Sequence, residues 1–258
     1  MILRRLGNKS KIAKMIQAHF PPHKIYIEPF FGAGGMFFNK PKAYHNILND
    51  LDSDVFNLFQ VVINNPDDLK KAFRIMPLHM DLLKYWGVNN ETDPIKKALR
   101  FLLLSNYGYM GKPETFRLTA SKTEYAEKFD HNLDITSKRL FNCQFANMDF
   151  RSFIEGVTFQ KDGRNDEAKT FIYCDPPYLN QTSNYSDNGW SEADSNDLFD
   201  CLQATGCKWA MSEFDHPFIL QQAKERKLNI TYIGERQNLK NRRIEVLITN
   251  YKNALTLF

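Results

Sequence analysis

An aspartate, two prolines and a tyrosine follow a short apolar run in the segment TFIYCDPPYLNQ (170–181). Asp175 supplies a carboxylate acceptor, and Pro176 and Pro177 hold the backbone in one shape, which fixes their carbonyl directions. Tyr178 offers a flat face on which a ring can stack. Two prolines cannot continue a central strand, so this corner must stand at a strand end.

The corner suits a planar amine. An exocyclic NH2 group can donate one hydrogen to the Asp175 carboxylate and one to a proline carbonyl. Both bonds draw the nitrogen lone pair out of conjugation with its ring and aim it at an electrophile. The alternative is an ordinary strand end and turn in which Asp175 caps a helix.

A glycine-rich turn lies earlier, in EPFFGAGGMFFN (28–39). Gly32, Gly34 and Gly35 allow the backbone to turn tightly and to approach a ligand closely. A lone Gly-x-Gly is equally typical of a plain strand-to-helix turn, but Asp50 ends the next apolar run and could accept hydrogen bonds from a ribose. The pairing favours a ligand with an adenosyl group; no G-K-[ST] follows the glycines, which argues against a phosphate-binding loop.

Alternating strands and helices are expected to position these residues. Helices are predicted over 9–20, after the glycine turn and from Ser53, and Ser191 with Asp194 forms a capping box that starts another. The expected strands lie around 25–27, before Asp50, and at 144–146, 170–174, 208–211, 230–233 and 245–251. This order predicts an α/β fold with a mostly parallel sheet, helices on both faces, and ligands at the carboxyl ends of the strands.

The middle of the chain has another character. Residues 66–140 are helical in pattern and then break into SNYGYMGKPETFRLTASKTEY, which indicates loops and a hairpin. We predict a catalytic domain formed by 1–65 and 141–258, with 66–140 as an inserted subdomain. Residues 96–140 carry nine Lys or Arg against five Asp or Glu, which favours a surface that faces a polyanion.

The composition excludes several classes of protein. The chain has 258 residues, 43% of them hydrophobic and 25% charged, and no apolar run that could span a membrane. Its N-terminus lacks the apolar core of a signal peptide, so a cytoplasmic protein is expected. The four cysteines form no C-x-x-C pair and the six histidines no H-E-x-x-H, so no metal site is expected.

Five segments in order, LGNKSK, FFGAGG, NDLD, DPPY and EVLITNY, resemble the Dam-type DNA N6-adenine methyltransferases, and the resemblance spans nearly the whole chain. It implies a Rossmann-like methyltransferase fold with S-adenosylmethionine as the methyl donor. It also implies a set of cofactor contacts: Lys9, Phe31, Gly32 and Gly34 at the methionine and sugar, Asp50 at the ribose, Asp149 and Phe150 at the adenine, and Asp175 at the border with the target.

The same resemblance implies that Asp175, Pro176, Pro177 and Tyr178 form the target-amine site and that Tyr185 and Ser212 lie near it. Such enzymes act on an adenine rotated out of double-stranded DNA. Basic residues of the insertion are then candidates for DNA contacts: Lys112, Arg117 and Lys122. For any one of them, a solvated surface position is the alternative. A bacterial or phage-encoded enzyme, monomeric or weakly dimeric, is expected.

Two departures from the family pattern stand out. The stretch between Phe150 and Asp175 is longer than usual, and SNYGYMGKPETFRL only loosely follows the usual recognition segment, so no target sequence is predicted. The alternative functions are methylation of an amine in RNA, methylation of another exocyclic amine, and binding without turnover by a catalytically silent module. Asp175 favours adenine, because related enzymes for guanine or glutamine carry Asn there and those for cytosine N4 carry Ser.

Overall fold

A computed structural model describes residues 2–3, 8–77, 79–107, 122–161, 164–179, 189–237 and 242–252. Within these ranges the side chains of 107, 122–125, 160–161, 164, 236–237 and 242 are left out of the description. No helix of the described part is long and apolar enough to cross a membrane.

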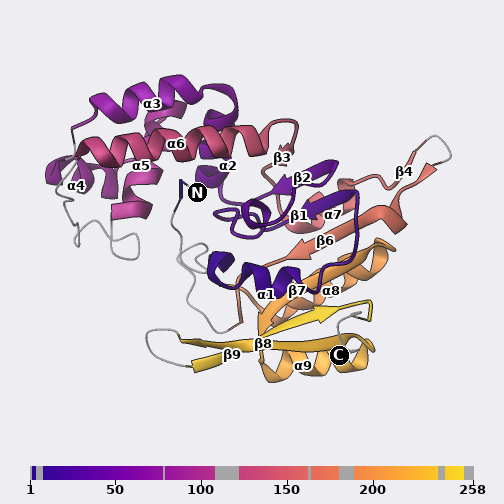
Figure 1. Cartoon of the computed structure of the whole chain (residues 1–258). Helices are drawn as coiled ribbons and strands as arrows, with labels where there is room; N and C mark the ends of the chain where they lie inside the picture. The colour runs from indigo at the N-terminus through magenta and orange to yellow at the C-terminus, as the bar shows by residue number, and fades with distance from the viewer. Residues whose placement is uncertain are drawn as a thin grey trace.

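A seven-stranded sheet forms the centre of the molecule (Figure 1), in the order β3-β2-β1-β6-β7-β9-β8. Neighbours from β3 to β7 pair in parallel, and β9 runs antiparallel to both β7 and β8. The strands are β1 (Ile25–Glu28), β2 (His45–Asn49), β3 (Gln144–Ala146), β6 (Thr170–Cys174), β7 (Lys208–Phe214), β8 (Asn229–Gln237) and β9 (Arg242–Thr249). The predicted mostly parallel α/β sheet is confirmed.

Helices cover both faces of the sheet. They are α1 (Ala13–Gln17), α2 (Ser53–Asn64), α3 (Pro66–Ile75), α4 (Met80–Val88), α5 (Pro94–Tyr107), α6 (Lys122–Leu140), α7 (Phe150–Gly156), α8 (Glu192–Ala204) and α9 (Pro217–Glu225). Side chains alternate across a strand, and two buried clusters result. Tyr26 and Phe171 face the cluster shared with α1 to α6, whereas Ile27 and Ile172 face the one shared with α7 to α9.

The glycine turn is not followed by the α-helix that its pattern predicts. One 3-10 turn, η2 (Phe37–Asn39), stands there instead. Lys40 is extended, with φ −113° and ψ 160°, because the proline that follows disfavours helical backbone at the residue before it. The predicted helix over 9–20 is likewise split, into the 3-10 turn η1 (Lys9–Lys11) and the short α1.

Helices α3 to α6 make a group at one side of the sheet (Figure 1). Their buried residues belong to the same cluster as α2 and one face of the sheet. Ion pairs of Lys70 with Asp134 and of Arg74 with Asp130 join α3 to α6. Within the long 150–175 stretch, β4 (Gln160–Lys161) and β5 (Arg164–Asn165) form a small antiparallel ladder, followed by η4 (Glu167–Lys169).

Candidate active site

The glycine turn closes over the carboxyl ends of β1 and β2. Gly32 and Gly34 have φ of 54° and 71°, in the left-handed region that favours glycine. A Cβ on Gly34 would collide with the rings of Phe38 and Phe31, but one on Gly32 would meet no atom of the described residues within 4 Å. The turn is therefore packed tightly at Gly34 and has open space beside Gly32.

Asp50 ties this turn to the end of β2. Its Oδ2 accepts a hydrogen bond of 2.6 Å from the Gly32 amide, and its Oδ1 accepts one of 2.9 Å from the Asp52 amide. The side chain of Asp52 in turn caps α2 through the Asp54 amide. Asp50 is thus held at the edge where the sequence predicts it, and it fixes the shape of the glycine turn. Phe31 beside it is 2% exposed and packs edge-on against Phe59.

The Asp-Pro-Pro-Tyr corner follows β6, the central strand, at the same edge of the sheet. Asp175 is 20% exposed, and its Oδ1 lies 3.0 Å from the Nζ of Lys9. Pro176 is buried and Pro177 half-buried. The corner therefore presents a partly exposed carboxylate held by a buried ammonium, which stabilises its negative charge.

Lys9 joins three other side chains, those of Asp175, Tyr178 and Glu245, into one network. Its Nζ lies 3.0 Å from the Oε1 of Glu245 as well, and it donates to the hydroxyl of Tyr178. That hydroxyl donates to Glu245 over 2.8 Å. Lys9 is 2% and Glu245 0% exposed. The contacts of Lys9 are thus with the Asp-Pro-Pro-Tyr corner and with β9. The 3-10 turn that carries Lys9 is capped by Asn8.

Tyr178 is turned inward in this structure. It is 8% exposed, the Lys9 Nζ lies 4.3 Å from its ring centroid, and its ring meets that of Phe214 edge-on at 4.5 Å. Burial, together with the charges of Asp175 and Glu245, raises the pKa of Tyr178 well above its usual range, so the hydroxyl stays a donor. A base that stacks on Tyr178 would have to displace part of this packing.

A second carboxyl group lies beside the network. Glu213, on β7, is 1% exposed, and its Oε1 accepts a hydrogen bond from the Phe214 amide. Its Oε2 is buried without a partner among the described residues. Burial raises the pKa of Glu213 well above its usual range and so favours its protonated form. Ser212, before it, bonds to Tyr173 within the sheet, with 2.8 Å between the two hydroxyl oxygens.

Asp149 and Phe150 stand at the start of α7, beyond β3. Asp149 caps the helix through the Arg151 amide. Phe150 is 4% exposed and packs against Phe30 and Trp190, with ring centroids 5.5 Å and 5.4 Å apart. Ordinary core packing thus accounts for much of Phe150, and Asp149 remains exposed to 41% at its side chain.

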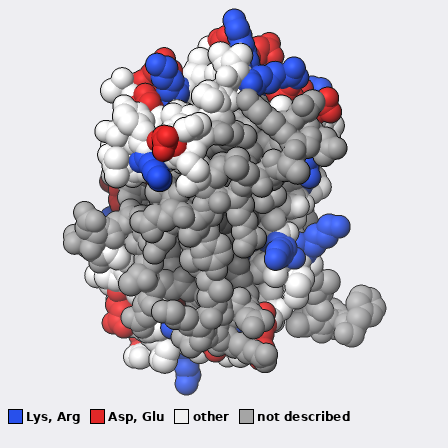
Figure 2. Space-filling model, turned by 90° about the vertical axis from the view of Figure 1, so that its left-hand side faces the viewer, with Lys and Arg blue, Asp and Glu red and all other residues white. Residues whose placement is uncertain are grey.

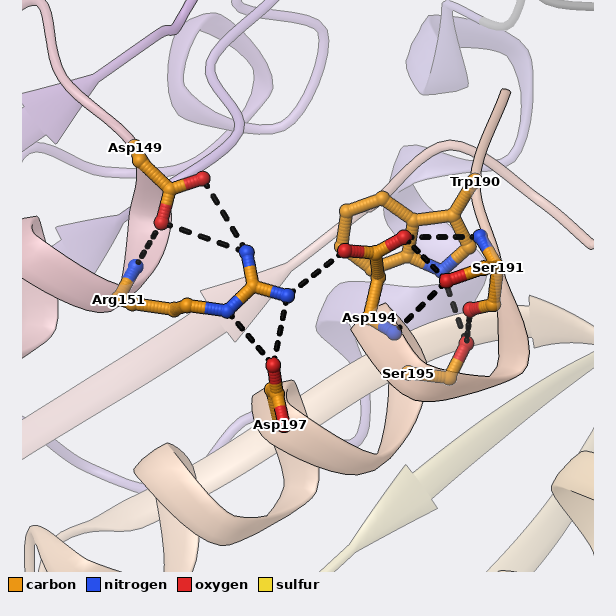
Figure 3. A network of polar contacts seen from close by, with 7 residues as sticks. All are labelled: Asp149, Arg151, Trp190, Ser191, Asp194, Ser195 and Asp197. Carbon is orange, nitrogen blue, oxygen red and sulfur yellow. Dashed lines mark hydrogen bonds and ion pairs between the residues drawn. The ribbon is translucent and has the colours of Figure 1, made fainter. Parts of the chain in front are cut away.

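Arg151 holds this end of the site together (Figure 3). Its guanidinium lies between Asp149 on one side and Asp194 and Asp197 of α8 on the other, with 2.7 Å to each carboxylate of α8. Burial opposes the ionised form of Asp194, but hydrogen bonds from Ser191 and Arg151 lower its pKa overall. Ser191 and Asp194 form the predicted capping box.

Glu28, at the end of β1, is a buried carboxyl that sequence reasoning did not single out. It is 2% exposed and accepts a hydrogen bond of 2.8 Å from the Tyr26 hydroxyl. Burial raises the pKa of Glu28 to about 8, while Tyr26 and Lys40 act to lower it. The ammonium of Lys40 lies 4.0 Å from the Tyr26 ring centroid, and burial lowers its pKa to about 8.

The predicted DNA contacts fall largely outside the described residues: Lys112, Arg117 and Tyr185, and the side chain of Lys122. Figure 2 shows the face that lies on the left-hand side of Figure 1, where α3 to α6 are grouped. Its coloured residues mix both charges over the helices, and Asp54 lies 3.3 Å from Lys97 and 3.5 Å from Arg100. The positive charge of this segment is thus partly neutralised where it is described.

Sequence reasoning missed Glu245 and Glu213. Glu213 lies past the end of the predicted strand 208–211, and Glu245 is the first residue of the predicted strand 245–251, so an acid bordering an apolar run was the available signal. No group of three or more side chains suited to a metal gathers among the described residues.

Comparisons with known proteins agree with the family resemblance of the sequence motifs. The model of the D12 class N6 adenine-specific DNA methyltransferases matches residues 6–246. The DNA adenine methylase of Salmonella typhi is 27% identical over 262 residues, covering 98% of this chain and 81% of the relative. That of Escherichia coli (strain K12) is 28% identical over 71% of this chain and 67% of the relative.

A type II methyltransferase of Methanocaldococcus jannaschii, M.MjaIII, is 29% identical and covers 76% of this chain and 74% of its own. Among solved structures, a human methyltransferase 10 domain containing protein aligns with a TM-score of 0.41 at 9% identity, over 95% of this chain and 81% of that chain. The chain belongs to the D12 class of N6 adenine-specific DNA methyltransferases, and it is an enzyme that methylates adenine in DNA.

Proposed function

We propose that the chain transfers a methyl group from S-adenosylmethionine to the N6 amine of an adenine rotated out of double-stranded DNA, with Asp175 as the residue that orients the amine. One observation carries this proposal. Asp175 stands at the carboxyl end of the central strand β6, partly exposed, with its charge balanced by the buried Lys9. Ligands of open α/β sheets bind at this edge.

The cofactor fits the half of the edge formed by β1, β2 and β3. The space beside Gly32 would admit a ligand against the backbone, since a Cβ there meets none of the residues that the structure describes within 4 Å. Asp50 is held rigidly by the Gly32 and Asp52 amides, yet a carboxylate has lone pairs left for hydroxyl donors. Asp50 would hold a ribose, and Asp149 would border the adenine. When bound, S-adenosylmethionine supplies an electrophilic methyl group on a sulfonium.

The other residues that the family resemblance places at the cofactor differ in what they contact. Phe31 and Phe150 are both nearly fully buried in contacts with other rings, so their role is to shape the walls of the cofactor site. Lys9 contacts Asp175, Glu245 and Tyr178. We therefore give Lys9 the role of positioning the amine corner, and its predicted contact with the cofactor methionine stays a prediction.

The residues of the corner have distinct parts. Asp175 and the Pro176 carbonyl accept the two hydrogens of the amine and turn its lone pair outward. Holding reactants at the correct distance and angle can lower a barrier by about 7–11 kcal/mol. The nitrogen becomes acidic after the new N–C bond forms, so it needs no strongly shifted base to release its proton. Rotating the base out of the duplex costs about a few kcal/mol, which stacking on Tyr178 is predicted to offset in part.

The test uses the purified chain, unmethylated double-stranded DNA, single-stranded DNA and bulk RNA, each with isotope-labelled S-adenosylmethionine. Digestion to nucleosides and mass spectrometry identify the methylated base. We expect N6-methyladenine from double-stranded DNA, and no label after Asp175→Ala. Asp200→Ala, which changes an exposed carboxylate of α8 that pairs with Arg226 outside the site, is the control and should keep most activity. Label in RNA or on cytosine N4 would overturn the assignment of adenine in double-stranded DNA as the substrate.

A further inference from the structure

Arg243 lies on the substrate side of the active edge. β9 runs antiparallel to β7, and Phe214 at the end of β7 pairs with Glu245. The start of β9 therefore lies beside the carboxyl end of β7, at the edge that carries Asp175. Because residues two apart in a strand share a face, Arg243 stands on the same face as Glu245, one step closer to the end of the sheet.

A chain of ring contacts leads from Arg243 to the amine corner. Its guanidinium carbon lies 5.7 Å from the ring centroid of Phe214. The Phe214 ring meets Tyr178 edge-on at 4.5 Å. Arg243 is thus two rings away from the network of Lys9, Asp175 and Glu245. Its side chain is half-buried, and its guanidinium lies within the range of a cation–π contact with Phe214.

Arg243 differs from the other arginines in having no hydrogen bond or ion pair among the described residues. The other arginines with described side chains are bonded to acceptors of the chain itself: Arg74, Arg100, Arg139, Arg151 and Arg226. A guanidinium has five N–H donors in a fixed fork that matches the oxygens of a phosphate or carboxylate. A half-buried guanidinium with none of these donors used by the described part of the chain points to an external anion.

The position of Arg243 selects the DNA over the cofactor. β9 is separated from β1 by β6 and β7, and three strand spacings amount to roughly 14 Å. The cofactor half of the edge is formed by β1 to β3, whereas Arg243 adjoins the corner that takes the target amine. The anions nearest that amine in a nucleic acid are the phosphates that flank the rotated nucleotide.

We propose that Arg243 binds a backbone phosphate next to the target adenine, as a contact that holds the extruded nucleotide at the corner. This proposal rests on the proposed function of the same site. Such a contact carries no sequence information, because phosphates are alike along the strand. β9 then has two roles: Glu245 holds the corner through Lys9 and Tyr178, and Arg243 binds the DNA backbone.

The decisive variant is Arg243→Gln, which removes the charge and keeps a polar side chain that can donate hydrogen bonds. Arg226→Gln is a matched control: its guanidinium also covers a ring, Phe199 at 5.4 Å, but it pairs with Asp200 and follows α9, toward the opposite edge of the sheet. The probe is unmethylated double-stranded plasmid DNA, with S-adenosylhomocysteine to measure cofactor affinity.

For Arg243→Gln we expect KM for DNA to rise about tenfold, and the slope of log KM against log salt to fall by roughly 0.9, the value for one lost phosphate contact. Affinity for S-adenosylhomocysteine and the kcat at saturating DNA should stay within about twofold. Arg243→Lys should keep the salt slope of the parent and have a KM between those of the parent and Arg243→Gln, because a point charge replaces the two-pronged guanidinium. Arg226→Gln should leave both quantities as in the parent.

Either of two results in Arg243→Gln would overturn the inference: an unchanged KM and salt slope, or a loss confined to S-adenosylhomocysteine affinity, which would assign Arg243 to an anionic group of the cofactor. Equal effects in Arg226→Gln would do the same, since they would reduce the role of Arg243 to folding. A parent chain that labels no DNA adenine overturns the proposed function itself. That result is seen without any variant, so the two failures are distinguishable.

Discussion

Lys9 and Glu245 form an ion pair of 3.0 Å in the interior, although they come from opposite ends of the chain. Each also touches the amine corner: Lys9 through Asp175 and Tyr178, and Glu245 through the Tyr178 hydroxyl. An ion pair buried this deeply is weak evidence for net stability, because desolvation offsets the attraction. Its placement is better explained by the need to hold the corner in one conformation.

Replacing Glu245 separates these effects. Glu245→Ala leaves Tyr178 without its acceptor and Lys9 with one carboxylate fewer, and breaking such a buried pair costs about 3–5 kcal/mol of the free energy of unfolding. Glu245→Gln keeps the volume and an acceptor oxygen, so we expect a smaller loss of stability. If the network positions Asp175, Glu245→Gln should lower kcat more than tenfold while S-adenosylhomocysteine affinity is kept. Urea unfolding and steady-state kinetics measure both; kcat at the parent value would contradict the positioning role.

The sheet was largely predictable from the chain. The bounds predicted for β3 and β6 coincide with the structure, because short apolar runs there are bounded by turn residues. The helix after the glycine turn was not, because the effect of Pro41 on Lys40 outweighs the apolar spacing of Met36 to Phe38. The division into a catalytic domain and a 66–140 insertion stays a prediction.

The site was predictable only in part. Asp175 and Asp50 could be placed at the active edge from strand ends alone. Glu245 and Arg243 could not, because their place depends on β9 pairing antiparallel with β7, and strand alternation in a sequence does not reveal the neighbour. Lys9 was matched to the right edge by motif, but its partners come from segments far along the chain.

Asp50 should matter for the cofactor and Asp52 for the fold. Asp50→Ala removes the acceptor of the Gly32 amide and the predicted ribose ligand, so we expect S-adenosylhomocysteine affinity to fall at least tenfold, or about 1.4 kcal/mol. Asp52→Ala removes the cap of α2 and should cost about 1 kcal/mol of stability with little change in affinity. Isothermal titration calorimetry and urea unfolding give the two numbers. Equal affinities in Asp50→Ala and the parent would count against the ribose assignment.

Gly34 should tolerate a methyl group far less than Gly189. Both have positive φ, 71° and 66°, so alanine at either strains the backbone by about 1–2 kcal/mol. At Gly189 the new Cβ meets nothing within 4 Å in the described part of the chain, but at Gly34 it collides with Phe38 and Phe31. We expect Gly34→Ala to lose clearly more stability than Gly189→Ala in thermal unfolding, and to weaken S-adenosylhomocysteine binding through the displaced turn. Equal losses would show that the turn relaxes freely.

Glu28 should make the protein less stable as pH rises from about 5 to 8. Its pKa is raised from 4.5 to about 8 in the folded chain. Between those values the unfolded chain releases the proton that the folded chain retains, so the free energy of unfolding falls with rising pH and the stabilisation is complete only below the unfolded pKa. Lys40, with its pKa lowered to about 8, acts with the opposite sign only above that value. Urea unfolding at pH 5.5 and 7.5 measures the slope, and Glu28→Gln, which cannot ionise, should flatten it relative to the parent. Parallel slopes in the two proteins would mean that Glu28 ionises as easily in the folded chain as in the unfolded one.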